Sequence, residues 1–307
     1  MSPQDGSTLL AFHEDETKAQ ALAGSQRAGR AAIRPFMPDQ HREFFALLPY
    51  LFVATVDGQG WPMASVLTGD TGFVQSPDPV TLRIGALPAS DDPAAPTFTA
   101  GAEVGLIGLD FTTRRRNRAN GQLIAVDDGL TVRIAQSFGN CPQYIQTRTA
   151  TPRAAAGAPV ERLDRLDAAA LALIAASDTF FVASRSRAGI GDGGLDMSHR
   201  GGKPGFVGVV GDTLVIPDFR GNRFYNTLGN LLGDPRAGLL FIDFASGDVL
   251  QLQGRAAIDW HPEGNGPAGA ERLWRVSVER AWRRRGAFPF GWRFGSYAPT
   301  TLATGTW

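Results

Sequence analysis

The chain has 307 residues, 43% of them hydrophobic, and its formal net charge is zero. This length is enough for one large domain or two small ones, and the balanced charge argues against a general binder of nucleic acid or membrane surfaces. The single cysteine, Cys141, excludes an intramolecular disulfide framework, and with four scattered histidines we expect no protein-built metal site. We expect no signal peptide or membrane span, and therefore a cytoplasmic location.

In chain order, residues 1–45 predict a polar, helical lead-in. A first strand-rich half follows over 46–150, where short β segments such as FVATVD and EVGLIGLDF are separated by Gly and Pro. Residues 151–178 hold a connecting helix, predicted over 160–176 from its apolar spacing. A second strand-rich half covers 179–285, and 286–307 form an aromatic, irregular tail. The pattern predicts a mainly β, α+β protein built from antiparallel barrels with flanking helices.

The two strand-rich halves resemble each other in the same order of elements. FVAT at 52–55 matches FVAS at 181–184, GLIGLDF at 105–111 matches GLLFIDF at 238–244, and Ser65 aligns with Ser198. These matches predict a tandem repeat of two half-barrels packed on one another. Chance similarity between β segments is the alternative.

The halves differ most clearly in LVIPDFRGNRFYNTLGNLLGDPR, at 214–236. Apolar residues at helical spacing predict a helix that begins near Arg223 and ends at Gly233. The start of a helix disfavours cations and favours anions, so arginines placed there indicate a bound phosphate. The donors offered to it are Arg220, Asn222, Arg223 and Asn226.

The alternative for this loop is a solvated turn whose arginines pair with Asp218 and Asp234. A second polar cluster, DMSHRGGKPGF at 196–206, contains Ser198, His199, Arg200 and Lys203, and in the alignment of the halves the counterparts of its first three are Ser65 and the apolar Val66 and Leu67. This exchange indicates a ligand edge, although a lone histidine is usually a surface residue. The densest basic run, TTRRRNRANG at 112–121, is either a solvated hairpin tip or a positive wall between the half-barrels.

Four segments carry a resemblance to a known family: SHRGGKPGFV, TLVIPDFRGNRFYNTLGNLLGDPRAGLLFIDF, LQGRA and SFGNCPQYIQ. Together they resemble the pyridoxamine 5′-phosphate oxidase-like family of FMN-binding split barrels, over the range from Phe44 to Ile258. FHEDETKAQALAG and VERAWRRRGAFP are similar to members that carry two half-barrels in one chain. The resemblance implies tandem split barrels with FMN at the interface between them, within one chain or in a homodimer.

The resemblance also implies roles for particular residues. It places the phosphate at Asn222 and Arg223, the isoalloxazine edge along 198–203, and the ribityl chain beside 217–219. Together with the loop argument, the expected cofactor-binding residues are Ser198, His199, Arg200, Lys203, Pro217, Asp218, Phe219, Arg220, Asn222, Arg223, Asn226, Arg115 and Arg116. The last two would reach the flavin from the first half.

The function implied is an FMN-dependent oxidoreductase acting on a small substrate, with electrons from NAD(P)H or a separate donor. His199 is the candidate catalytic residue, and Arg200, Lys203 or His199 would place positive charge or a proton donor by the flavin edge. The arginine, histidine and tyrosine set that would hold pyridoxal phosphate is incomplete, so pyridoxamine phosphate oxidase activity is not expected. The alternatives are a non-catalytic flavin- or haem-binding carrier or sensor, and a reductase that uses deazaflavin F420.

Overall fold

A computed structural model describes residues 9–25, 32–154 and 158–307. Its helices are α1 Glu14–Leu22, α2 Asp39–Ala46, α3 Ala168–Ala176, α4 Asn226–Gly233 and α5 Pro299–Leu302, with a 3-10 turn at Ala95–Thr97. In these three ranges, no helix has the length and apolar character needed to cross a membrane.

Strands make up most of the structure. In the first half they are β1 Tyr50–Val56, β2 Pro62–Thr68, β3 Val74–Asp78, β4 Thr81–Ile84, β5 Glu103–Asp110, β6 Arg115–Val126 and β7 Leu130–Asn140. In the second half they are β10 Thr179–Arg185, β11 Leu195–Gly201, β12 Gly208–Val210, β13 Thr213–Phe219, β14 Arg236–Ile242, β15 Val249–Asp259 and β16 Ala270–Arg284. The remaining strands are β8 Arg148–Pro152, β9 Glu161–Leu163 and β17 Phe290–Phe294. The prediction of a mainly β chain with flanking helices is confirmed.

The two large sheets have the same strand order. The first runs β2-β1-β5-β6-β7-β4-β3 and the second runs β11-β10-β14-β15-β16-β13-β12, and the pairings are antiparallel. Val53 lies opposite Ser65 in the first sheet, just as Val182 lies opposite Ser198 in the second. Since register decides which face a side chain occupies, Ser65 and Ser198 hold equivalent positions, as their alignment in the sequence predicts.

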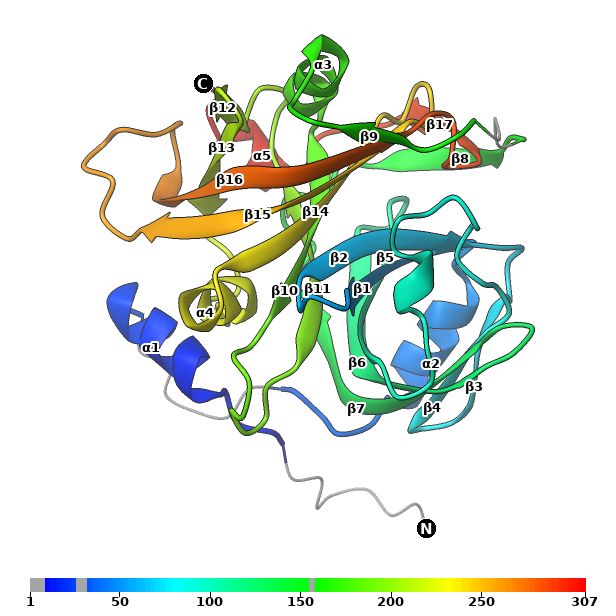
Figure 1. Ribbon diagram of the computed structural model, residues 1–307. Coiled ribbons are helices and arrows are strands. Elements are labelled where there is room, and N and C mark those ends of the chain that lie inside the picture. The colour runs from blue at the N-terminus through cyan, green and yellow to red at the C-terminus, as the bar shows by residue number, and fades with distance from the viewer. Residues whose placement is uncertain (1–8, 26–31, 155–157) are drawn as a thin grey trace.

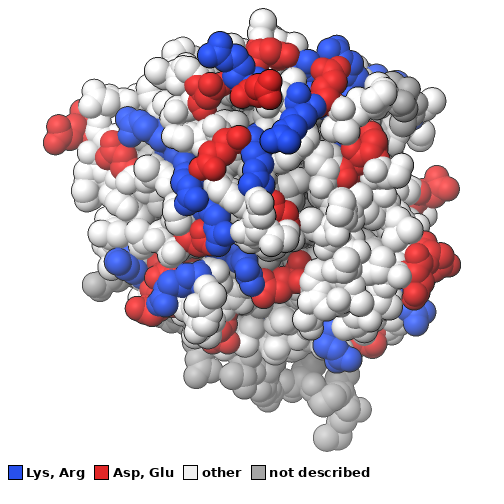
Figure 2. Space-filling view, viewed as in Figure 1, with Lys and Arg blue, Asp and Glu red and all other residues white. Residues whose placement is uncertain are grey.

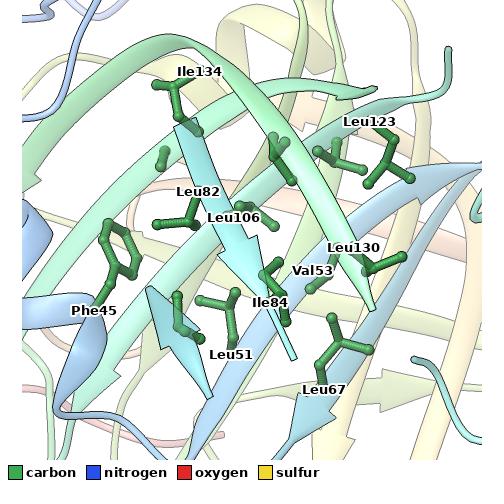
Figure 3. Close-up of a cluster of buried hydrophobic side chains, with 14 of the residues drawn as sticks. Phe45, Leu51, Val53, Leu67, Leu82, Ile84, Leu106, Leu123, Leu130 and Ile134 are labelled. Atoms are coloured by element: carbon green, nitrogen blue, oxygen red, sulfur yellow. The ribbon is translucent and has the colours of Figure 1, made fainter. Parts of the chain in front are cut away.

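Each sheet curls around its own apolar core, and the two barrels pack side by side (Figure 1). Figure 3 shows the core of the first barrel, where Phe45 from α2 meets inward-pointing strand residues such as Leu51 and Leu106. A third cluster fills the interface between the barrels. At its centre, Phe52 on β1 and Phe181 on β10 stack with ring centroids 3.6 Å apart. The apolar part of the interface is therefore buried in the same way as a domain core.

Two glycines allow the barrels to approach closely. A Cβ atom on Gly105 of β5 would lie 2.5 Å from the carbonyl oxygen of Leu195, and one on Gly238 of β14 would lie 2.5 Å from that of Pro62. Gly105 meets the first residue of β11, and Gly238 meets the first residue of β2. Because β2 and β11 hold equivalent places in the two sheets, the contact repeats about a pseudo-two-fold axis. Because the neighbouring atoms are backbone, only a residue without a side chain fits.

Replacing Gly105 with alanine is expected to lower the free energy of unfolding by about 1–3 kcal/mol, because the added methyl group overpacks the interface. Denaturant unfolding monitored by tryptophan fluorescence measures the loss. Gly58→Ala is the control, since a Cβ atom there meets nothing within 4 Å. Equal losses from the two variants would contradict the assignment of this contact.

Two expectations about segment boundaries are wrong. The sequence predicts a connecting helix over 160–176, but α3 begins only at Ala168, because the Asp167 carboxylate caps it by accepting from the Ala170 N–H at 2.8 Å. The preceding Glu161–Leu163 forms β9 beside β16. The tail is also more regular than expected, since β17 pairs with the distant β8 and is followed by α5.

Candidate functional site

A cavity lies between the two barrels, where β6 and the end of β7 of the first barrel meet the second barrel. The first barrel contributes β6, the end of β7 and the segment that follows it, and the second contributes β11, β13, the loop into α4, α4 itself and β16. The charged and polar lining residues are Arg116, Arg118, Asn140, Gln143, Tyr144, Ser198, His199, Arg200, Asp218, Asn222, Arg223, Tyr225, Asn226, Thr227 and Arg272. Residues of both barrels of the one chain therefore line this cavity.

The cavity lining carries an excess of positive charge. Five of its residues are arginines and one is an aspartate, although the chain as a whole is neutral. On the face shown in Figure 2 the two signs are interspersed. Exposed pairs such as Arg255–Glu279 neutralise each other. Arginines converging on a concave, partly buried site give a positive potential that favours an anionic ligand.

Asp218 organises the base of this cavity. Its Oδ1 accepts a hydrogen bond from Nη1 of Arg200 at 2.5 Å, and its Oδ2 accepts one from Nε of Arg272 at 2.9 Å. One buried carboxylate therefore fixes the orientation of two guanidinium groups, each of which has five N–H donors to share among its partners. Asp218 lines the cavity, and it also positions these two arginines.

The loop before α4 differs from the predicted helix start. The helix begins at Asn226 rather than near Arg223, and Tyr225 before it is left-handed, with φ 59°. Arg223 is left-handed as well, with φ 61°, so the chain turns twice before the helix can start. The Asn222 side chain supports the turn, because its Oδ1 accepts from the Phe224 N–H at 3.1 Å.

The start of α4 still faces the cavity, because Asn226, Thr227 and Leu228 line it. These residues carry the first N–H groups of the helix, and its first turn contains no acidic residue. The guanidinium of Arg223 forms no ion pair with any carboxylate in the described ranges. The alternative, in which the loop arginines pair with Asp218 and Asp234, is wrong. Asp218 pairs with Arg200 and Arg272, and Asp234 pairs with Arg236.

His199 is a neutral hydrogen-bonding group. Its Nδ1 lies 3.0 Å from Nη1 of Arg116, and because arginine only donates, Nδ1 accepts and the ring proton sits on Nε2. Burial, followed by the charges of Arg116 and Arg200, lowers the pKa of His199 well below its ordinary value of 6.5. The expectation that His199 could supply positive charge is therefore wrong, although its Nε2–H remains a donor.

Ten of the thirteen residues predicted from the sequence line the cavity. They are Arg116, Ser198, His199, Arg200, Pro217, Asp218, Phe219, Asn222, Arg223 and Asn226. The basic run on β6 thus forms a wall of the cavity through Arg116 and Arg118, rather than a solvated hairpin tip.

The other three predicted residues do not line the cavity. Lys203 donates to the carbonyl oxygens of Leu302 and Thr304 at 3.0 and 2.8 Å, next to α5. Arg220 is exposed, and its carbonyl oxygen accepts from the Tyr144 hydroxyl at 2.9 Å. Arg115 is exposed and its guanidinium lies over the Phe44 ring, because alternate residues of β6 face opposite sides.

Several lining residues escaped the sequence argument. Arg118 could have been predicted from the alternation of side chains along a strand. It lies two residues after Arg116 on β6, so the two side chains share one face. Tyr144 lies in the quoted segment SFGNCPQYIQ, and its ring stacks on Phe219 with centroids 5.5 Å apart. Arg272 belongs to β16, far along the chain, and reaches the site only because β16 pairs with β13.

The equivalent position in the other half is filled by the protein itself. There Ser65 replaces Ser198, and it donates to Asp92 at 2.6 Å. Gln251 occupies the position of Arg118 and also donates to Asp92, and Arg284 completes the cluster at 3.0 Å. Asp92 and Arg284 are almost fully buried. The two halves thus share a topology but differ in this site.

Comparisons with known proteins found no matching family model and no matching curated protein. Among solved structures, a variant of HupZ from Group A Streptococcus aligns with 39% of this chain and 99% of its own, at 12% identity and TM-score 0.30. A FAD-binding protein from Mesorhizobium loti aligns with 41% of this chain and 97% of its own, at 13% identity and TM-score 0.28. The Bacillus subtilis inhibitor of motility MotI/DgrA aligns with 75% and 87%, at 8% identity and TM-score 0.22.

Proposed function

We propose that this chain is a flavoprotein that binds one FMN in the cavity between its barrels and acts as an oxidoreductase on a small substrate. The observation that carries the proposal is the lining itself, in which five arginines surround a single aspartate and four aromatic rings lie among them. A ligand with a phosphate and a flat ring system matches this combination of donors and apolar faces. The sequence resemblance to FMN-binding split barrels supports the same ligand.

The residues present fit FMN at both ends. Arg223, the Asn226 side chain and the first N–H groups of α4 would hold the phosphate at the exposed end of the cavity. The rings of Tyr144, Phe219 and Tyr225 would cover the apolar faces of the cofactor. Three lining residues carry buried polar atoms that lack a partner in the described structure: Nε2 of His199, Oδ1 of Asn140 and Nε of Arg118. Buried polar groups normally have partners, and a bound ligand would supply them.

When bound, FMN would supply the redox chemistry. The protein's part is to orient it and to set the local charge. Nη1 of Arg116 lies 3.0 Å from Nδ1 of His199, both residues line the cavity, and in the proposed orientation they would face the ring system of the cofactor. Arg116 forms no ion pair with a carboxylate in the described ranges, and such a positive charge would stabilise an anionic ring more than a neutral one. NAD(P)H or a separate donor is the proposed electron source, and a homodimer is the proposed assembly.

The visible absorption spectrum of the purified protein, with mass analysis of what it releases on denaturation, is the decisive experiment. We expect an oxidised-flavin spectrum and one FMN per chain, because the equivalent position in the first half is filled by Asp92 and Arg284. Release of F420 or haem would keep the anion-binding cavity and replace the proposed chemistry. A colourless protein that takes up no added FMN would overturn the proposal. If NAD(P)H is not oxidised by the loaded protein, the oxidoreductase part fails on its own.

A further inference from the structure

A second cavity, of about 430 Å³, lies beside α3 in the second barrel. Its walls are α3, the end of β14 with the turn after it, the end of β16 and the first residue of β8. Figure 1 shows α3 at the top of the second barrel, away from α4. This cavity shares no lining residue with the one between the barrels. Its volume falls within the range of small-molecule sites, so it is large enough for a ligand of its own.

Part of the lining is apolar and comes from α3 and the end of β14. The residues are Ala169, Ala172, Leu173, Ala176, Ile242 and Phe244. Three of the four helix residues are alanines, so little side-chain volume extends from α3 into the cavity. Apolar surface of this kind favours an apolar ligand body, because binding removes both surfaces from water.

A buried ion pair is the polar part of the lining. Nη2 of Arg148 donates to Oδ2 of Asp178, and the two side chains are 7% and 5% exposed. Nη1 of Arg148 and Oδ1 of Asp178 have no hydrogen-bond partner among the described residues. Buried polar atoms normally have partners, and leaving them without one is costly. Both residues line the cavity, so a bound molecule can supply the two partners.

Aromatic rings hold the guanidinium of Arg148 in place. Its Cζ lies 4.1 Å from the ring centroid of Phe244 and 5.6 Å from that of Phe294. Phe244 is itself fixed, because it packs edge-on against Phe111 with centroids 5.5 Å apart. The donor of Arg148 and the acceptor of Asp178 therefore keep one relative geometry, which is what a preorganised binding site requires.

The charges of this lining cancel, in contrast to the cavity between the barrels. Three arginines are matched by three aspartates: Arg148, Arg283, Arg285, Asp178, Asp243 and Asp248. Arg283 already pairs with Glu161 and Asp167, and Arg285 pairs with Glu161. With no excess of either sign, the lining favours a neutral ligand over an anion or a cation.

The equivalent positions of the first barrel lack both features of the site. With β1 and β10 in the same register, Pro49 stands in place of Asp178 and Phe44 in place of Leu173. Proline has no carboxylate, and phenylalanine is bulkier than leucine. The guanidinium of Arg115 also lies over the Phe44 ring, 4.9 Å from its centroid. The site is therefore a feature of the second half rather than a consequence of the shared fold.

We propose that the cavity beside α3 is a second ligand site, and that its ligand is a small neutral molecule with an apolar body and a primary carboxamide. The carboxamide oxygen accepts from Nη1 of Arg148 while its NH2 donates to Oδ1 of Asp178, so one planar group satisfies both atoms. A carboxylate in this place would be repelled by Asp178, and an amidinium by Arg148. The inference is independent of FMN, because the two cavities have separate linings.

The first test compares three probes of nearly equal shape on the wild-type protein. Benzamide is neutral, benzoate is an anion and benzamidinium is a cation. We expect benzamide to bind with a dissociation constant in the millimolar range or lower, and about tenfold or more tighter than either ion. Backbone amide shifts measure the affinities and locate the site, since signals of α3 and Asp178 should move. Equal binding of the three probes, or no binding of benzamide at about 20 mM, would overturn the proposal.

The second test blocks the cavity and leaves the ion pair intact. Ala172 and Ala175 are both exposed on α3, but only Ala172 lines the cavity. Ala172→Phe should therefore weaken benzamide binding by about tenfold or more, whereas the matched control Ala175→Phe should leave it unchanged. FMN affinity should be the same in both variants. Unchanged benzamide binding in Ala172→Phe would refute the site, and a protein that never binds FMN would refute only the proposed function.

The third test concerns the group that reads the carboxamide. Asp178→Asn keeps an oxygen acceptor and removes the negative charge, so Arg148 should then favour an anion. The preference between benzamide and benzoate is expected to shift toward benzoate by about tenfold or more. An unchanged preference would show that other residues select the ligand and would overturn the assignment to Arg148 and Asp178. The first two tests decide on the site even where this variant does not fold.

Discussion

Replacing Arg284 with methionine is expected to lower the free energy of unfolding by about 3–5 kcal/mol, the usual effect of removing one partner from a buried ion pair. Arg284 holds Asp92 at 3.0 Å and Asp91 at 2.7 Å, and the side chains of Arg284 and Asp92 are 4% and 1% exposed. Without the arginine, the donors left to Asp92 among the described residues are neutral, and they include Ser65 and Gln251. A carboxylate buried in that state must either stay uncompensated or take up a proton.

The neighbouring residue supplies a matched control. Arg285 is about half exposed and pairs with Glu161, so Arg285→Met is expected to cost less than about 1 kcal/mol. Adding Asp92→Asn to Arg284→Met should recover part of the loss, because the two changes remove both charges of one pair. Urea unfolding of the four proteins decides the matter. Similar losses at 284 and 285 would mean that the cluster contributes little.

The repeat of the two halves could be predicted from the sequence because it lies in the strands. The strand matches around 52–55 and 105–111 predicted a repeat, and the register of the two sheets places those segments at equivalent positions. Alternating strands constrain side-chain direction strongly, so a matched strand also predicts which residues share a face. Ser198 and His199, which align with Ser65 and Val66, line the cavity, and their contact with a ligand remains a prediction.

What the sequence could not predict depends on contacts between distant segments. The late start of α4 follows from left-handed backbone at Arg223 and Tyr225, residue types that rarely adopt this conformation and give no local signal for it. Arg272 enters the cavity through the pairing of β13 with β16, and Glu16 reaches α4 from the opposite end of the sequence. Helical spacing and strand alternation describe one element at a time, whereas these contacts depend on how elements pack.

Replacing Arg223 with alanine is expected to weaken FMN binding by about 1.5–3 kcal/mol, the contribution of a hydrogen bond to a charged group, which corresponds to roughly a 10- to 150-fold higher dissociation constant. Arg223 has no competing carboxylate in the described structure, so its guanidinium is available to the phosphate. Arginine and alanine are similarly strained at φ 61°, so protein stability should change little. Fluorescence titration of the apoprotein with FMN measures the affinity.

Two controls separate a phosphate contact from a general charge effect. Arg83→Ala removes an exposed arginine from β4 of the first barrel and should leave FMN affinity unchanged. Riboflavin, which lacks the phosphate, should bind wild type and Arg223→Ala with equal affinity, because only the phosphate would meet this side chain. An equal loss for riboflavin and FMN would move Arg223 away from the phosphate. Unchanged FMN affinity would remove the loop before α4 from the cofactor site, and the arginines held by Asp218 would then be the remaining candidates for the anion.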